Sequence, residues 1–165
     1  MSVPDVIAQE RKKLPGASRY VMFPTIAEPR GQLSFMEGES HIPFAIKRVF
    51  IIAGVPPDGR RGGHAHRSLG EVIIALTGSL EVSLDDADER AEVRLSRPDK
   101  GLYIPPMVWA EEGQFAPGTI VLVLASAPYD ESDYVRDYDA FTAMAFQRQE
   151  QEKEGRPGCH CPISR

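Results

Sequence analysis

The amino-acid sequence predicts an all-β fold, a sandwich or barrel of short strands, with one short helix near its C-terminal end. Two observations support this fold class. From residue 19 to residue 125, short segments rich in β-branched and aromatic residues are separated by Pro, Gly and Asp, at the spacing typical of sandwiches and barrels. No long helical periodicity interrupts that stretch, and apolar residues at helical spacing begin only after Asp137.

The length and composition predict one β domain with two flanking segments. A chain of 165 residues with 42% hydrophobic residues suits a single soluble domain. We expect an N-terminal arm or early helix over residues 1–18, the β domain over 19–138, and a C-terminal helix and flexible tail over 139–165.

The candidate strands follow one another closely. In chain order they are residues 20–23, 32–36, 47–52, 71–77, 80–84, 92–95, 102–104, 108–111 and 120–124. Leu80, Val82 and Leu84 alternate with polar residues, which is the pattern of a strand with one buried face. The preceding Thr77-Gly78-Ser79 predicts a tight hairpin turn, and the acidic run 85–89 predicts a solvated turn.

The C-terminal helix is expected from about residue 139 to residue 152. Phe141, Met144 and Ala145 recur at helical spacing, and Asp137 or Asp139 can cap the first turn. This apolar stripe predicts packing against the β domain. Beyond the helix, Cys159-His160-Cys161 offers too few ligands for a structural zinc site, so we expect an exposed tail.

The charge balance limits the classes of partner. A net charge of −5 and a pI near 5.4 give no general attraction to nucleic acid or to an anionic membrane, so any phosphate must be held by a few local arginines. The N-terminus lacks the apolar core of a signal peptide, and the longest apolar run, near residues 120–125, is too short to span a bilayer. We therefore expect a cytoplasmic protein.

Two histidines mark the candidate site. His64 and His66 stand two residues apart, and in a β-strand that spacing directs both rings to one face. Near neutral pH an imidazole can both accept and return a proton, which suits proton abstraction beside a carbonyl and reprotonation at the neighbouring carbon. Arg48, Arg60 and Arg61 lie nearby, and guanidinium groups suit a diphosphate.

The same stretch resembles the first motif of the cupins, small β-barrels with a ligand cavity. His64, His66, Glu71 and Gly78 have the spacing of that motif. Two His and one Glu are three of the usual four metal ligands of cupins. The stretch corresponding to the second motif, residues 101–111, contains no histidine. Metal-free use of the histidine pair is therefore favoured, and a three-ligand metal site remains the alternative.

Most of the chain, from about residue 30 to residue 138, resembles the cupin ketoisomerases that convert dTDP-4-oxo-6-deoxyglucose into its 3-oxo isomer. The resembling segments are residues 42–50, 61–66 (Arg-Gly-Gly-His-Ala-His), 76–86, 101–109, 123–126 and 129–138. The resemblance implies an RmlC-like cupin jelly-roll barrel without metal or other cofactor. It also implies a homodimer with exchanged N-terminal strands, acting on a dTDP-sugar in deoxysugar, lipopolysaccharide or other glycan biosynthesis.

The resemblance also implies roles for individual residues. His66 would be the principal acid and base, moving a proton from C3 to C4 through an enediol, with His64 assisting and Arg61 holding the diphosphate. Independently of the resemblance, the guanidinium group of Arg48 makes it a further candidate for substrate binding. Two aromatic residues in the segment that resembles the cavity wall, Tyr103 and Trp109, are further candidate substrate contacts. Tyr129, Tyr134 and Tyr138 are expected to pack over the barrel.

Two positions depart from the family pattern. Phe50-Ile51 stands where some members have a tyrosine, and Ala110 stands where some have a histidine. Three functions therefore remain open: a sugar-nucleotide 3,4-ketoisomerase, a metal-dependent cupin that uses His64, His66 and Glu71, and a non-catalytic sugar-nucleotide-binding cupin.

Overall fold

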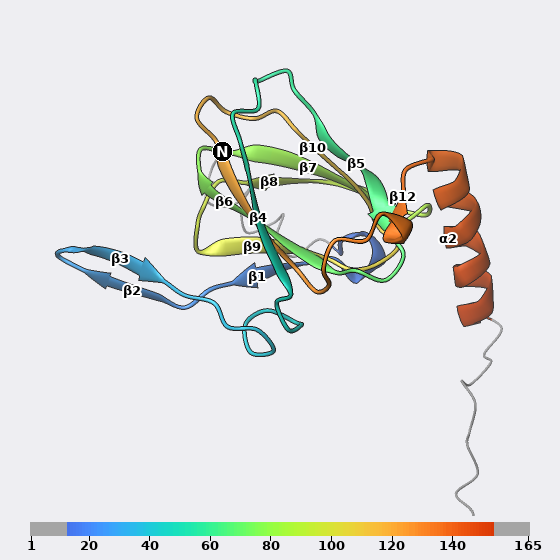
Figure 1. Cartoon of the computed structure of the whole chain (residues 1–165), viewed down its shortest axis with the longest axis horizontal. Helices are drawn as coiled ribbons and strands as arrows, with labels where there is room; N and C mark the ends of the chain where they lie inside the picture. Colours follow the sequence, from blue (N-terminus) through green and yellow to red (C-terminus); the bar gives the residue numbers. More distant parts are fainter. Residues whose placement is uncertain (1–12, 154–165) are drawn as a thin grey trace, which may run out of the picture.

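Two five-stranded antiparallel sheets face each other in the computed structural model, which describes residues 13–153 (Figure 1). The first sheet has the order β1 (Arg19–Met22), β9 (Lys100–Ile104), β6 (Glu71–Thr77), β11 (Ile120–Ala125) and β4 (Arg48–Ala53). The second has the order β12 (Tyr134–Val135), β5 (Arg61–His66), β10 (Trp109–Gly113), β7 (Leu80–Asp85) and β8 (Arg90–Leu95).

The predicted all-β class with a short C-terminal helix is confirmed, but the sheets do not close into a barrel. Each sheet is hydrogen-bonded only within itself among the described residues, so β4 and β8 remain edge strands. Short 3-10 turns, η1 (Pro15–Ala17) and η2 (Glu131–Asp133), precede the outer strands β1 and β12.

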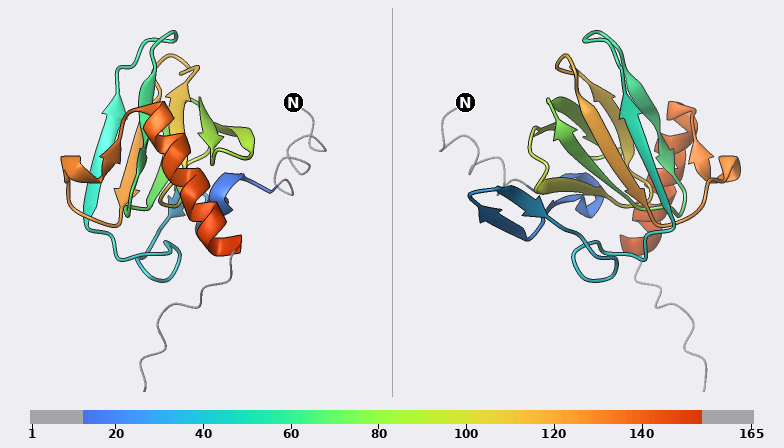
Figure 2. Two further views of the ribbon diagram at one scale, coloured as in Figure 1. Left: turned by 90° about the vertical axis from the view of Figure 1, so that its right-hand side faces the viewer. Right: turned by 60° about the vertical axis from the view of Figure 1, so that its left-hand side comes forward.

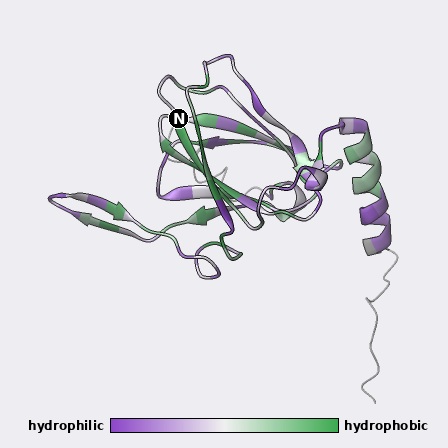
Figure 3. Cartoon of the chain, viewed as in Figure 1, coloured by the Kyte–Doolittle hydropathy of each residue, from purple (hydrophilic) through white to green (hydrophobic). Residues whose placement is uncertain are grey.

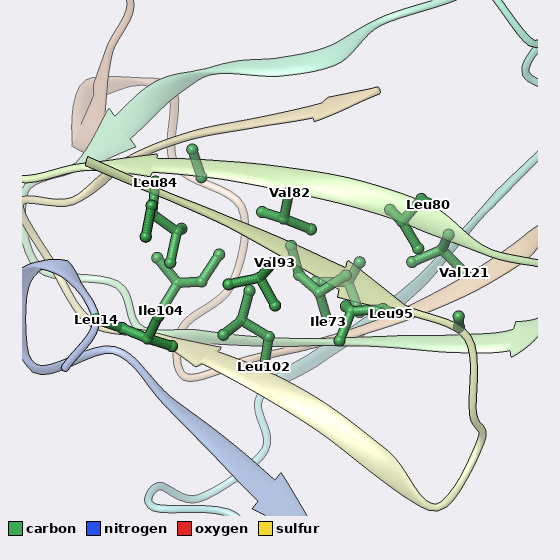
Figure 4. Close-up of a cluster of buried hydrophobic side chains, with 14 of the residues drawn as sticks. Leu14, Ile73, Leu80, Val82, Leu84, Val93, Leu95, Leu102, Ile104 and Val121 are labelled. Carbon is green, nitrogen blue, oxygen red and sulfur yellow. The ribbon is translucent and has the colours of Figure 1, made fainter. Parts of the chain in front are cut away.

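The main core lies between the two sheets (Figure 4). The alternation predicted for β7 is confirmed, because Leu80, Val82 and Leu84 are buried there against side chains from the other sheet, such as Ile73 and Leu102. This rigid packing holds the strands that carry the candidate site at one end of the sandwich.

The predicted hairpin at Gly78 is wrong. Strand β6 pairs with β9 and β11, whereas β7 belongs to the other sheet, so this short connection carries the chain from one sheet to the other. Gly78 has φ +68°, and a Cβ atom there would lie 2.3 Å from Oγ1 of Thr119. The sequence indicates a break between two strands, but it does not show whether the two strands belong to the same sheet.

A separate hairpin projects from the sandwich. It consists of β2 (Thr25–Glu28) and β3 (Gly31–Ser34), where the sequence predicts only one strand, at residues 32–36. Figure 1 shows it extending away from the two sheets, and Figure 3 shows apolar segments in it. Ile26 and Leu33 are half exposed, at 49% and 58%. The strands β5 and β12 are also absent from the predicted strands.

The predicted C-terminal helix is confirmed as α2 (Tyr138–Lys153), which crosses one side of the molecule (Figure 2). The Asp137 carboxylate accepts a hydrogen bond from the Ala140 amide at 2.7 Å, so Asp137 is the capping residue. Phe141 and Ala145 are buried against the sandwich, as the apolar stripe predicts. Within residues 13–153, no helix is long and apolar enough to cross a membrane. The arm over residues 1–12 and the Cys159-His160-Cys161 tail lie outside the described residues.

Candidate active site

A cavity of about 430 Å³ opens at one end of the sandwich, between the two sheets. The strands β4, β5, β6, β10, β11 and β12 all contribute to its wall. The lining residues are Phe50, Ile51, Ile52, Arg60, Arg61, Gly62, His64, His66, Glu71, Glu112, Val123, Tyr134 and Arg136. Both imidazoles, two carboxyl groups and three guanidinium groups therefore share one enclosed space.

Strand β5 directs both histidines into this cavity, as their spacing predicts. The ring centroids of His64 and His66 lie 5.0 Å apart, with the rings nearly perpendicular. Ala65, between them, points the other way and is buried under α2. The convergence of the two rings is confirmed, and their catalytic roles stay a prediction.

Asp133, from η2, fixes the orientation of His66. Its carboxylate lies 2.9 Å from Nδ1 of His66 and accepts hydrogen bonds from the Ser68 amide and hydroxyl at 2.8 and 2.7 Å. Because a carboxylate can only accept, Nδ1 of His66 donates the proton of this bond. That arrangement leaves Nε2 of His66 as the basic nitrogen.

The cavity keeps both imidazoles neutral near neutral pH. Burial lowers the pKa of His64 to about 4. Burial also lowers the pKa of His66, although the hydrogen bond and charge of Asp133 act in the opposite direction. Partial burial acts to raise the pKa of Asp133, but the hydrogen bonds from Ser68, His66 and Leu69 together lower it, so Asp133 carries its charge.

Tyr134 is a site residue that the sequence analysis missed. Its ring lies 4.8 Å from the His64 ring and 4.3 Å from the His66 ring, between centroids, and its hydroxyl accepts a hydrogen bond from Arg48 at 3.4 Å. The expectation that Tyr134 only packs over the barrel is therefore wrong. The signal was available: Tyr134 and Arg136 have the same two-residue spacing as the histidines, and both line the cavity.

The arginines occupy different depths. Arg60 and Arg61 are exposed at the cavity wall, and Arg60 forms an ion pair with Glu111. Arg136 is also exposed, with its guanidinium group 4.4 Å from the centroid of the Tyr134 ring. Arg48 lies deeper, half-buried against Phe50 and Tyr134, and does not line the cavity. Arg136 forms an ion pair with Glu131 at 2.8 Å. Exposed arginines, two of them ion-paired, therefore line the entrance, whereas the imidazoles lie deeper.

Two buried carboxyl groups complete the wall. The pKa of Glu71 is raised to about 8, mainly by burial and also by the nearby Glu112 carboxyl group, while Arg48 opposes the shift. Burial raises the pKa of Glu112 to about 7, opposed by its own backbone hydrogen bond and by Arg61. Both carboxyl groups therefore hold protons well above the pH at which exposed glutamates lose them.

Tyr103 and Trp109, predicted as substrate contacts, do not line the cavity. Leu102 and Ile104 point into the core, so Tyr103 projects from the outer face of its sheet, where Arg19 lies 4.6 Å above its ring. Trp109 lies on the face of β10 opposite to the cavity, against Tyr138 and Phe141 of α2. Strand alternation therefore places both aromatic rings away from the histidines.

The metal alternative finds no support in the arrangement of side chains. Across residues 13–153, no three His, Cys, Asp or Glu side chains are grouped so that they could hold a metal ion. His64, His66 and Glu71 share the cavity, but they do not form such a group. The two imidazoles are instead grouped with the Asp133 carboxylate and the Tyr134 ring.

The sequence of this chain is similar to those of known sugar-nucleotide ketoisomerases. The model of the family FdtA (WxcM-like, C-terminal) matches residues 17–146. A TDP-4-oxo-6-deoxy-α-D-glucose-3,4-oxoisomerase from Aneurinibacillus thermoaerophilus is 42% identical over 124 residues, covering 75% of this chain and 89% of that protein.

Two crystal structures of the 3,4-ketoisomerase QdtA from Thermoanaerobacterium thermosaccharolyticum are similar in fold and sequence. The complex with TDP is 42% identical, covers 82% of this chain and 98% of QdtA, and has a TM-score of 0.80. A histidine-to-asparagine mutant in complex with TDP-4-keto-6-deoxyglucose is 43% identical, covers 79% and 95% of the two chains, and has a TM-score of 0.78.

Proposed function

Because the chain belongs to the FdtA family (WxcM-like, C-terminal), we propose that it is an isomerase that moves the keto group of a TDP-linked 4-oxo-6-deoxyhexose from C4 to C3. One observation in its own structure carries this proposal: His66, oriented by Asp133, presents a neutral basic nitrogen to a cavity whose entrance is lined by arginines. Such a cavity can hold a sugar carbonyl beside a base and a diphosphate beside arginines.

The substrate enters with its sugar first. His66 and the two carboxyl groups are buried and His64 is half-buried, whereas Arg60, Arg61 and Arg136 are exposed. Guanidinium groups bind the negatively charged diphosphate well even where solvent reaches them, and the uncharged hexose suits the enclosed end of the cavity. This orientation brings the sugar ring to the histidines and leaves the nucleotide outside.

The proton transfer follows from that orientation. Nε2 of His66 removes the proton from C3 of the 4-oxo sugar, and the electrons of that C–H bond form the C3–C4 double bond of an enediolate, with the negative charge on the C4 oxygen. The same nitrogen returns a proton to C4, while the hydroxyl proton on the C3 oxygen moves to the C4 oxygen. The neutral imidazole of His64, 5.0 Å away between centroids, can assist this second transfer.

Tyr134 argues against a non-catalytic binding protein. The strand β4 has no hydroxyl at Phe50 or Ile51, but the Tyr134 ring lies 4.3 Å from the His66 ring and its hydroxyl is held by Arg48. A phenol at this point can hydrogen-bond to a sugar oxygen. The cavity therefore contains a base with its orienting carboxylate and a neighbouring hydroxyl.

We also propose that the working protein is a homodimer. Ile26 and Leu33 on the projecting hairpin are exposed, and so are Val49 and Ile51 on the edge strand β4 (55% and 63%). Exposed apolar side chains beside an unpaired strand edge are typical of an interface between copies of a chain. The cytoplasmic location expected from the sequence stays a prediction.

The decisive experiment is an isomerase assay in D₂O with TDP-4-keto-6-deoxyglucose, followed by NMR of the product. We expect a 3-keto sugar with deuterium at C4. The proton that His66 takes from C3 exchanges with D₂O when its transfer to C4 is slower than this exchange. A protein that binds TDP but leaves the sugar unchanged would be a non-catalytic binding protein instead.

A further inference from the structure

The mechanism uses neither of the two carboxyl groups that line the cavity, those of Glu71 and Glu112, and of these two only Glu112 has a buried oxygen without a hydrogen-bond partner. Glu112 is 5% exposed and lines the cavity, and its Oε2 atom is buried with no hydrogen-bond partner. A buried polar atom without a partner is costly and uncommon. Its place in the wall of a ligand cavity indicates that the partner arrives with the ligand.

The backbone around Glu112 is shaped to make room for this carboxyl group. Strand alternation points Glu112 inward, while its neighbour Glu111 pairs with Arg60 at the entrance. Across the strand pair, Gly62 has φ +73°, and a Cβ atom there would lie 2.8 Å from Oε2 of Glu112. Any side chain at Gly62 would therefore displace the carboxyl group.

The register of β5 and β10 places Glu112 relative to the histidines. Ala110 is opposite His64, and Glu112 is opposite Arg61. Along β5 the order is therefore His66, His64 and then Arg61 with Glu112 across from it. The register therefore places the Glu112 carboxyl group on the entrance side of His64, level with Arg61.

The order of atoms in the substrate matches the order of these residues. In a sugar nucleotide the diphosphate is on C1, the next carbon is C2, and the carbons that react are C3 and C4. We propose that Glu112 hydrogen-bonds the C2 hydroxyl of the hexose and thereby selects sugars that carry a hydroxyl group at that carbon. This inference rests on the proposed function, because it takes the reacting carbons to lie at His66.

The test compares the steady-state kinetics of Glu112→Leu and Glu112→Gln. Leucine fills similar space without a hydrogen-bonding atom, so the KM for the sugar nucleotide should rise about tenfold, the size of one lost hydrogen bond. Glutamine keeps an acceptor and should keep KM close to the wild-type value. The affinity for TDP alone should not change in either variant, because TDP has no hexose. Glu92→Leu, an exposed position on β8, is the matched control.

The 2-deoxy sugar nucleotide completes the test without any substitution. The wild-type protein should bind it about tenfold more weakly than the parent sugar, and Glu112→Leu should not discriminate between the two. This arm decides the matter even if the leucine variant is unstable. Equal KM values for the two sugars in an active wild-type protein would overturn the inference and leave the proposed function standing. A wild-type protein without isomerase activity would overturn both.

Discussion

His66 and Asp133 form a hydrogen-bonded pair, 2.9 Å between Nδ1 and Oδ2, although 67 residues separate them in the chain. The contact exists because the short edge strand β12 pairs with β5 and brings η2 against Ser68. It sets which nitrogen of His66 is basic, and so it determines the chemistry of the site.

Replacing His66 with Asn should abolish proton transfer while leaving binding intact. Loss of a general base costs about a hundredfold to ten-thousandfold in rate. We expect kcat to fall by that factor with no deuterium at C4 of the product, and TDP affinity to remain, measured by calorimetry. Near wild-type turnover in a folded variant would remove His66 from the mechanism.

Replacing Asp133 with Asn should lower kcat by about a hundredfold or more with little change in KM, because the amide can stabilise the wrong imidazole tautomer. Asp133 also acts to raise the pKa of His66. The acid limb of the pH profile of kcat/KM should therefore move to lower pH. Asp130→Asn is the control, because Asp130 caps the same turn through Ser132. Equal effects of the two substitutions would indicate a purely structural role.

Replacing Arg61 with Ala should weaken binding rather than chemistry. A contact to the diphosphate is the same in the ground state and the transition state, so its loss raises KM and leaves kcat nearly unchanged. The dissociation constant for TDP should rise in parallel. Arg94→Ala, which removes a guanidinium group far from the cavity on β8, controls for net charge. A fall in kcat at constant KM would contradict this role.

Replacing Glu71 with Gln should change how stability depends on pH. The pKa of Glu71 is about 8 in the folded protein and about 4.3 in an unfolded chain. Between these values the folded state holds the extra proton, so ionisation of the unfolded state makes the wild type less stable as pH rises.

The free energy of unfolding of Glu71→Gln, minus that of the wild type, should therefore increase from about pH 5 to about pH 8, by up to roughly 1.4 kcal/mol per pH unit, and then level off. Below about pH 4 both states are protonated and the difference should be constant. Contributions from the histidines cancel in this comparison. A difference independent of pH would show that Glu71 is ionised in the folded protein. Urea denaturation across this range measures it.

Replacing Ile26 and Leu33 with Asp should prevent dimerisation. Both are exposed on the hairpin, and a buried charge at an interface is strongly destabilising. Light scattering should report a dimer for the wild type and a monomer for the double variant. Phe146→Asp, an equally exposed apolar position on α2, should remain dimeric. A monomeric wild-type protein would remove the dimer proposal.

Local sequence determined most of the strands of the sandwich and the convergence of the histidines. Alternation along β7 and the two-residue spacing of His64 and His66 depend only on strand geometry, so both features could be predicted without tertiary contacts. The same holds for α2, because helical spacing and the Asp137 cap are local signals.

Tertiary structure decided which residues share the cavity. Asp133 and Tyr134 reach the histidines only through the pairing of β12 with β5, a long-range contact that no local pattern encodes. The outward direction of Tyr103 and Trp109, and the crossing between sheets at Gly78, depend on which face of each strand meets the core. The alternation of polar and apolar residues can be read along each strand from the sequence, but only the packing of the two sheets determines which side of each strand faces inward.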